Sequence, residues 1–209
     1  MKQLLLKIAN IPFVWNTAQN IVGANPWKNR VYPSVFETKG KLLDFGCSIG
    51  NNTGVFLDFD EYHGVDLDPL AIAGAKERWK EYPQVQFHAL DILENGYKQA
   101  YFDHVLFACA GHHIPDALMR PILDALFLNL RPGGTLHFFD VLRQPEKDRY
   151  ITRLILKNDQ GKFMRTRGEY DTLFAPYQHL ISEDRMFPSP DRLIKLQDMR
   201  YLRLVKHLG

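Results

Sequence analysis

Two acidic residues and two glycines in the first half of the chain have the spacing of a nucleoside-binding site. Residues 41–53 read KLLDFGCSIGNNT, in which an apolar run meets Asp44 and then a turn flanked by Gly46 and Gly50. A bend that is poor in side chains lets a bound nucleoside approach the backbone. Asp66 ends a second apolar run 22 residues after Asp44. That separation is near the ~20 residues at which an acid reaches ribose hydroxyls in a Rossmann-type unit.

A pair of histidines, His112 and His113, follows a later apolar run and offers acid–base chemistry. Imidazole titrates near neutral pH, so it can take a proton from a hydroxyl or an amine. The alternative is that one ring packs and forms hydrogen bonds beside a ligand. Two adjacent histidines without a third ligand make a poor metal site, so we expect no bound metal.

Strand and helix signals alternate around these residues. Apolar runs predict strands at 41–46, 61–66, 84–89, 103–109 and 134–141. Helical spacing predicts helices at 51–57, 69–81, 118–129 and 145–157. Strands that alternate with helices indicate parallel βαβ units and a sheet covered on both faces.

Local signals fix some of the boundaries of these elements. Asp68 and Pro69 suit the N-cap and the first turn of a helix. The run 132–134, Pro-Gly-Gly, predicts a turn that ends one helix and begins a strand.

The two ends of the chain lie outside the regular alternation. Residues 1–38 predict two or three short helices, with breaks at Pro12, Gly23 and Pro26. Residues 169–174 predict a short helix. Residues 179–187 and 199–207 predict two strands joined by a Pro-Ser-Pro turn.

Together these pieces resemble the class I S-adenosylmethionine-dependent methyltransferases. Residues 44–50 are similar to the family's acid-x-Gly-x-Gly-x-Gly loop, with Ser48 in place of the central glycine. Four further pieces follow in the family's order, at 64–68, 89–92, 102–116 and 130–134. The resemblance covers about residues 41–141. It implies a Rossmann-like seven-stranded α/β sheet, mostly parallel with an antiparallel final strand, and helices on both faces.

The resemblance also implies S-adenosylmethionine as cofactor, S-adenosylhomocysteine as product and a set of residues that bind them. Asp66 would accept hydrogen bonds from the ribose, or else serve as a capping or turn residue. Asp91 would accept from the adenine amino group, or else be an N-cap. The expected cofactor-binding residues are Asp44, Gly46, Cys47, Ser48, Gly50, Asp66, Leu67, Asp91, Ile92, Phe107 and Ala108.

His113 is the candidate catalytic residue, as a general base on the loop after the fourth strand, although the family commonly has a histidine at this position even where no base has to be assigned. A structural or cofactor-lining role is the alternative. Aromatic and basic side chains in the flanking segments would either form a lid over the acceptor or pack in the core, and we expect packing for most of them: Trp15, Trp27, Tyr32, Arg167 and Tyr170.

Length and composition indicate one domain over residues 1–209. Within it we expect an N-terminal helical cap at 1–38, a cofactor-binding core at 39–142, and C-terminal helices with a closing strand pair at 143–209. No run of 18 apolar residues occurs, so no transmembrane segment is expected. Lys7 and Pro12 interrupt the apolar amino terminus, which argues against a secretion signal. Two cysteines do not make a disulfide framework, and a cytoplasmic setting is expected.

Charge is unevenly distributed along the chain, although the net charge is only +2. Residues 42–142 hold six basic and fourteen acidic residues, whereas 1–41 and 143–209 each carry a net charge of +5. The basic flanks would face an anionic acceptor or an acidic surface. The simpler interpretation is that they are ordinary solvated helix faces.

The predicted function is methyl transfer from S-adenosylmethionine to a small molecule, such as a lipid-like or natural-product acceptor, by in-line displacement. Residues 107–111 lack the Asn/Asp-Pro-Pro-aromatic sequence of family members that methylate exocyclic or amide nitrogens. No dense Lys/Arg patch is present, so nucleic acid is not the expected partner. One alternative is a non-catalytic S-adenosylmethionine-binding regulatory or partner subunit. A nicotinamide-dependent oxidoreductase would need Gly-x-Gly-x-x-Gly, which this loop does not supply.

Overall fold

The computed structural model of the chain describes residues 24–144, 162–189 and 197–207. The expected helix at 145–157, the expected helices before residue 24 and Trp15 all lie outside the described residues. None of the described helices is both long enough and apolar enough to cross a membrane.

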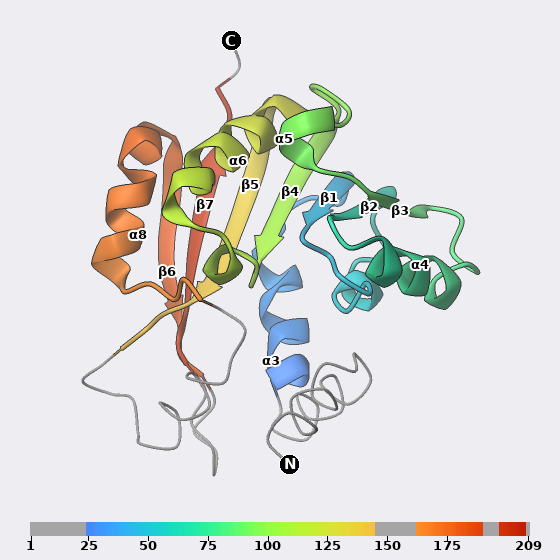
Figure 1. The fold of residues 1–209 in the computed structure, drawn as a ribbon, viewed down its shortest axis with the longest axis horizontal. Coiled ribbons are helices and arrows are strands. Elements are labelled where there is room, and N and C mark those ends of the chain that lie inside the picture. Colours follow the sequence, from blue (N-terminus) through green and yellow to red (C-terminus); the bar gives the residue numbers. More distant parts are fainter. Residues whose placement is uncertain (1–23, 145–161, 190–196, 208–209) are drawn as a thin grey trace.

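Seven strands form one sheet in the order β3-β2-β1-β4-β5-β7-β6 (Figure 1). Strands β1 to β5 pair in parallel, whereas β7 runs antiparallel to both β5 and β6. The predicted sheet, including the closing antiparallel pair, is therefore confirmed. The strands are β1 (Lys41–Phe45), β2 (Glu61–Asp66), β3 (Val85–Ala89), β4 (Phe102–Ala108), β5 (Leu130–Val141), β6 (Ile181–Phe187) and β7 (Met199–Val205).

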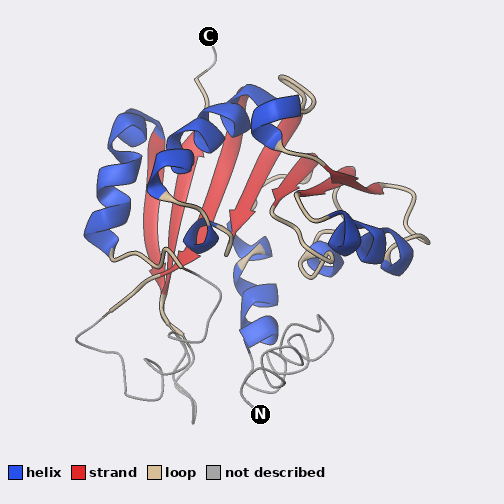
Figure 2. Cartoon of the chain, viewed as in Figure 1, coloured by secondary structure: helices blue, strands red, loops and turns tan. Residues whose placement is uncertain are grey.

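Helices cover both faces of the sheet, as predicted (Figure 2). The α-helices are α3 (Ala24–Val31), α4 (Pro69–Arg78), α5 (Ile92–Asn95), α6 (Asp116–Asn129) and α8 (Arg167–Phe174). Short 3₁₀ turns lie at Pro33–Val35, Thr53–Val55, Gly111–His113 and Ala175–Leu180.

Two apolar cores result from the alternation of side chains along each strand. Leu43 and Phe107 pack with α6 and α8 on one face. Leu42 and Leu106, their sequence neighbours, pack with α3 and α4 on the other. A central sheet buried on both sides explains why the middle strands read as continuous apolar runs.

Three local predictions were wrong. The helix expected at 51–57 is only a 3₁₀ turn, because Asn, Thr and Gly are weak helix formers and Gly54 packs against Trp79. The Pro-Gly-Gly run at 132–134 does not precede β5; it lies within the strand as a bulge opposite β4. Pro26 does not break a helix, since it lies in the first turn of α3, where a missing N–H is tolerated.

The parallel pairing places the ends of β1, β2 and β4 at one edge of the sheet. Phe45 is in register with Val65 of β2 and Phe107 of β4, so the loops that follow these three strands lie together. Helix α3 lies next to the carboxyl end of β4 (Figure 1). The predicted site residues lie at the ends of these strands or in the loops after them, except Asp91 and Ile92, which follow β3.

Candidate functional site

The loop after β1 bends tightly against the end of β2. The N–H groups of Gly46 and Cys47 both donate to the Val65 carbonyl, at 2.9 and 3.2 Å. Gly46 and Gly50 have φ of +74° and +70°, a region that disfavours side chains. A Cβ at Gly50 would also lie 2.7 Å from Trp79 Nε1. The bend therefore requires glycine at both positions.

Ser48 stands at the top of this bend with φ of +49°, so a non-glycine residue adopts the left-handed conformation. Its N–H donates to Asp66 Oδ2 at 2.8 Å, and the N–H of Asp68 donates to Oδ1 at 3.0 Å. These two bonds fix the Asp66 carboxylate at the end of β2. A carboxylate offers about four acceptor sites, so it retains capacity for further donors.

Asp44 is 1% exposed at the end of β1. Tyr62 donates to its Oδ2 at 2.5 Å, while Oδ1 has no hydrogen-bond partner within the described part of the chain. Burial raises the pKa of Asp44 to about 7, although Tyr62 and Asn52 oppose the shift. A buried acceptor without a donor is costly, so Oδ1 is a candidate acceptor for a bound group.

The predicted adenine-binding residues lie beyond β2 and β3. The Leu90 N–H donates to the Asp66 carbonyl at 3.0 Å, which joins the two strand ends. Asp91 caps α5 by accepting from the Leu93 N–H at 2.8 Å. Ile92 is buried in the core, so only its backbone faces a ligand, whereas Leu67 is 70% exposed. The N-cap alternative for Asp91 is therefore present, and its contact with adenine stays a prediction.

The end of β4 is more enclosed than the sequence suggested. The Phe107 ring lies 5.0 and 5.1 Å from the rings of Phe45 and Phe138, in the core. Ala108 is also buried. Contacts from Phe107 to a ligand would have to come from its main chain.

Cys109, the next residue, has φ of +53° and is held from two sides. Its N–H donates to the Phe139 carbonyl at 2.8 Å, and its Sγ lies 3.2 Å from the Tyr32 hydroxyl. Tyr32 follows α3 and is 1% exposed, so this contact attaches the α3 segment to the end of β4.

The histidine pair divides into two different environments. His112 is 7% exposed, and its Nδ1 lies 2.5 Å from Asp140 Oδ1. His113 is exposed, with its ring centroid 4.2 Å from that of His112. The structure thus places the carboxylate partner on His112, whereas the sequence prediction selected His113.

Asp140 lies near the end of β5 and is completely buried. Besides His112, it accepts from the Tyr170 hydroxyl at 2.6 Å and from the Val141 N–H at 2.8 Å. Burial alone would raise the pKa of Asp140, but the facing His112 and these hydrogen bonds lower it below the ordinary value. Asp140 is therefore an ionised orienting group for the His112 ring.

Arg165 holds the loop that carries both histidines. It is 3% exposed and donates to the carbonyls of Gly111 and Ile114, at 2.8 and 2.5 Å, and to the carboxylate of Asp116. These contacts fix the 111–116 loop from a segment about 50 residues further along the chain.

Sequence reasoning missed Asp140 and Arg165. Asp140 could have been found from the sequence, because it is an acidic residue at the carboxyl end of a predicted strand. The same pattern identified Asp44 and Asp66. Packing was the expected role for most flanking residues, and Trp27, Tyr32 and Tyr170 are all buried. Arg167 is exposed and pairs with Asp184.

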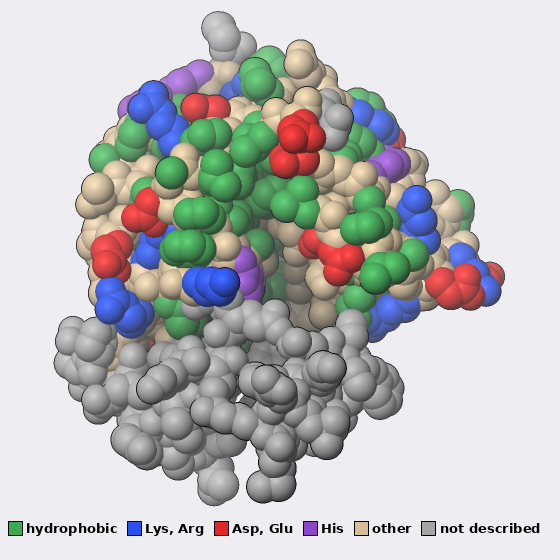
Figure 3. All heavy atoms as spheres, viewed as in Figure 1, with side chains coloured by type: hydrophobic (Ala, Val, Ile, Leu, Met, Phe, Trp, Pro, Cys, Tyr) green, Lys and Arg blue, Asp and Glu red, His purple; other side chains and the backbone are tan. Residues whose placement is uncertain are grey.

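The face shown in Figure 3 has a hollow near its centre. Hydrophobic side chains border the hollow, with histidine on one side and acidic side chains on the other. An apolar border with a few polar groups is typical of a small-ligand site.

Comparison with known proteins gives one family match. Residues 42–134 match the model of a methyltransferase domain. The methyltransferase calH of Penicillium decumbens is 24% identical over 159 residues, which are 69% of this chain and 42% of that protein. The non-reducing polyketide synthase sor2 of Hypocrea jecorina is 31% identical over 112 residues, 49% of this chain and 4% of that protein. The chain thus spans less than half of either curated relative.

Solved structures share the fold. A S-adenosylmethionine-dependent methyltransferase from Leishmania major superposes with a TM-score of 0.73 at 14% identity, covering 95% of this chain and 80% of that one. At this level of identity the likeness concerns the architecture of the sheet and its helices.

Proposed function

We propose that this protein transfers a methyl group from S-adenosylmethionine to a small-molecule acceptor, because residues 42–134 match the model of a methyltransferase domain and lie in a seven-stranded sheet. The observation that carries the proposal is the strand-end site. It combines a glycine bend, a strand-end carboxylate and a buried histidine–aspartate pair at one edge of the sheet.

The residues present suit this cofactor. A Cβ at Gly46 would lie 2.8 Å from the Ala110 Cβ, so glycine lets the backbone of the bend pack directly against the loop after β4. The unpartnered Oδ1 of Asp44 is a buried acceptor next to this bend, as a donor such as an ammonium group requires. When bound, S-adenosylmethionine supplies an electrophilic methyl group on its sulfonium.

Each part of the cofactor has proposed partners. Asp66, oriented by the N–H groups of Ser48 and Asp68, would accept from the ribose hydroxyls. The backbone of 46–48, with Gly50, would face the methionine part. Leu67 would pack on the adenine, and Asp91 and the backbone of Ile92 would meet its amino edge.

We assign the general base to His112 when the acceptor arrives protonated. Asp140 accepts the Nδ1 proton, so the basic lone pair of the ring lies on Nε2. The ionised Asp140 stabilises the imidazolium that forms when Nε2 takes a proton. Tyr170 and Arg165 keep this pair and its loop in one orientation. His113 stays the alternative base, and the two rings are close enough for a direct comparison.

Four observations support the acceptor class. The loop after β4 lacks the sequence typical of nitrogen-methylating members, and the flanking segments carry no dense basic patch. One curated relative is named as a polyketide synthase, an enzyme that makes small natural products. An apolar border around the hollow favours a largely apolar acceptor (Figure 3).

Incubation with S-adenosylmethionine carrying an isotopically labelled methyl group tests this proposal. Small-molecule extracts are added, and mass spectrometry follows the label. We expect one labelled small-molecule product, and its loss in the Asp66→Ala variant. Binding of S-adenosylmethionine by calorimetry with no transfer to any extract would favour the non-catalytic alternative.

A further inference from the structure

β3 is one of the two edge strands of the sheet, and β6 is the other. β3 has β2 as its only neighbour in the sheet of the described residues. Tyr62 N–H donates to the Gln84 carbonyl and Leu90 N–H donates to the Asp66 carbonyl, so the even-numbered residues of this segment bond to β2. The odd-numbered residues, Phe87 and Ala89 among them, direct their backbone groups outward. Such an edge is a template for one more strand.

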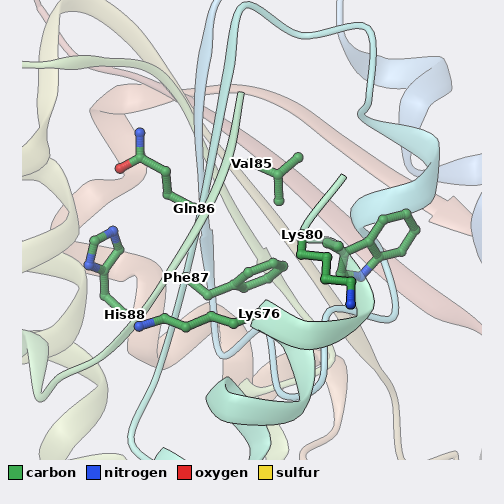
Figure 4. A pocket seen from close by; sticks show the side chains of 7 residues that line it. Lys76, Lys80, Val85, Gln86, Phe87 and His88 are labelled. Carbon is green, nitrogen blue, oxygen red and sulfur yellow. The ribbon is translucent and has the colours of Figure 1, made fainter. Parts of the chain in front are cut away.

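A cavity of about 280 Å³ lies beside this edge (Figure 4). Residues 85–88 of β3 line it together with Lys76 of α4 and with Trp79 and Lys80 just after that helix. Val85 and Phe87 point toward Lys80, whereas Gln86 and His88 point to the other side of the strand (Figure 4). Trp79 and Phe87, which line the cavity, also pack against Gly50 in the bend after β1. This site combines an open backbone edge with space for side chains, the two requirements for recognising an extended peptide.

The charge at the cavity is positive, although the surrounding stretch of sequence is acidic. No acidic residue lines it, and Lys76 forms no ion pair with any described residue. Lys80 pairs with Glu77, but both side chains are more than half exposed and the pair is therefore weak. Burial, together with Lys76 and Lys98, lowers the pKa of His88, which also lines the cavity.

We propose that the edge of β3 and its cavity bind an extended acidic segment of a partner protein, which adds to the sheet as an eighth strand. Acidic side chains of that segment would face Lys76 and Lys80, and its backbone would bond to the outward groups of Phe87 and Ala89. A second copy of this chain fits less well, because edge-to-edge pairing would bring two lysine-lined cavities together. A different role for the two lysines is to discourage aggregation through the open edge. If that were their only role, no peptide would bind.

Fluorescence polarisation on the full chain tests the proposal. The probe is a labelled eight-residue peptide that alternates glutamate and valine, and the comparison peptide has lysine in place of glutamate. We expect saturable binding of the acidic peptide only. The double variant Lys76→Glu/Lys80→Glu should weaken it at least about tenfold. Lys39→Glu, an exposed change on another part of the surface, is the matched control and should bind as the wild type does.

Ala89→Pro tests strand addition itself. Ala89 is exposed and its N–H points away from β2, so proline removes an outward donor without breaking the sheet ladder. Circular dichroism checks that the variant is folded, and we expect it to lose the peptide. Unchanged binding in either variant, or equal binding of the basic peptide, overturns the proposal. Sedimentation gives one further test. A wild-type dimer that the Ala89→Pro substitution dissociates would also overturn the proposal, because the edge would then bind a second copy of this chain.

Discussion

Buried polar groups have different partners in two parts of the molecule, the strand-end region and the histidine network inside the sheet. We define the strand-end region by Asp44, Ser48, Cys109 and Asp140, and the sheet network by Thr38, His104, His137 and Tyr201. The first contains an unpartnered carboxylate oxygen, two left-handed non-glycine residues and a fully buried acid. The second is a chain of neutral partners.

In the sheet network each ring nitrogen meets another neutral group. Thr38 Oγ1 lies 3.0 Å from His104 Nε2, His104 Nδ1 lies 3.3 Å from His137 Nε2, and His137 Nδ1 lies 3.0 Å from the Tyr201 hydroxyl. Burial lowers the pKa of both histidines. His112, by contrast, faces the ionised Asp140. The same side chain thus has only neutral hydrogen-bond partners in one place and faces an ionised carboxylate in the other.

The largest effect is expected at His112. His112→Asn should lower turnover by roughly 10²–10⁴-fold, because the proposed proton acceptor is removed. His113→Asn should change turnover far less. Steady-state rates with the labelled methyl donor and an identified acceptor provide the measurement. A larger loss in His113→Asn would return the catalytic role to His113.

His137→Phe is the matched change in the sheet network. It should leave turnover near the wild-type value but destabilise the fold by about 1–3 kcal/mol, because the Tyr201 hydroxyl loses its buried partner. Urea unfolding gives the stability. A large loss of turnover in the folded variant would remove the distinction between the two histidine environments.

Asp66→Ala should weaken binding of S-adenosylhomocysteine by about 1–3 kcal/mol, since two ribose hydroxyls lose a charged acceptor. Calorimetry measures the affinity. Asp68→Ala is the control, because Asp68 caps α4 through the Leu70 N–H and its loss affects stability rather than the ligand. Equal affinity in wild type and Asp66→Ala would exclude Asp66 from the site.

Lowering the pH should change the contributions of the two regions to folding stability in opposite directions. His104 and His137 have lowered pKa values, so their contribution is complete above about pH 6.5 and is lost as the pH falls below it. Each contributes a slope of at most about 1.4 kcal/mol per pH unit. Asp44 acts in the opposite direction, because its raised pKa makes the folded state bind the extra proton between about pH 4 and 7.

Urea unfolding at pH 5.0, 6.0 and 7.0 measures these slopes. We expect the wild type to lose stability toward pH 5, and Asp44→Asn to lose it more steeply because the opposing contribution is gone. His137→Phe should lose it less steeply. Stability that rises from pH 7 to pH 5 in the wild type would show that the sheet histidines are not held neutral.

The smallest effect is expected at Ser48. Glycine should relieve the left-handed backbone, which costs an L-residue about 1–2 kcal/mol, but it also adds unfolded-state entropy worth about 0.5–1 kcal/mol. Ser48→Gly should therefore stabilise the fold by roughly 0.5 kcal/mol. Ser48→Ala keeps the strain and serves as the control. A destabilised Ser48→Gly would mean that the serine side chain is itself required.

The amino-acid sequence determined the order of strands and helices, because apolar periodicity, the glycine turn and capping residues act within a few positions of one another. Asp68 does cap α4, and β2 spans the predicted 61–66. Together with the rule that parallel strands align their carboxyl ends, those local signals predict that Asp44 and Asp66 lie at the same end of the sheet. They did not separate a short 3₁₀ turn from a helix at 51–57, since packing against Trp79 decides that segment.

Only the tertiary structure decided which histidine has a carboxylate partner. Asp140 reaches His112 because Phe107 and Ala108 of β4 are in register with Phe138 and Phe139 of β5, a pairing between segments about 30 residues apart. The open edge of β3 likewise depends on where the sheet ends. Contacts between distant segments depend on register and on burial, and neither can be read from local spacing.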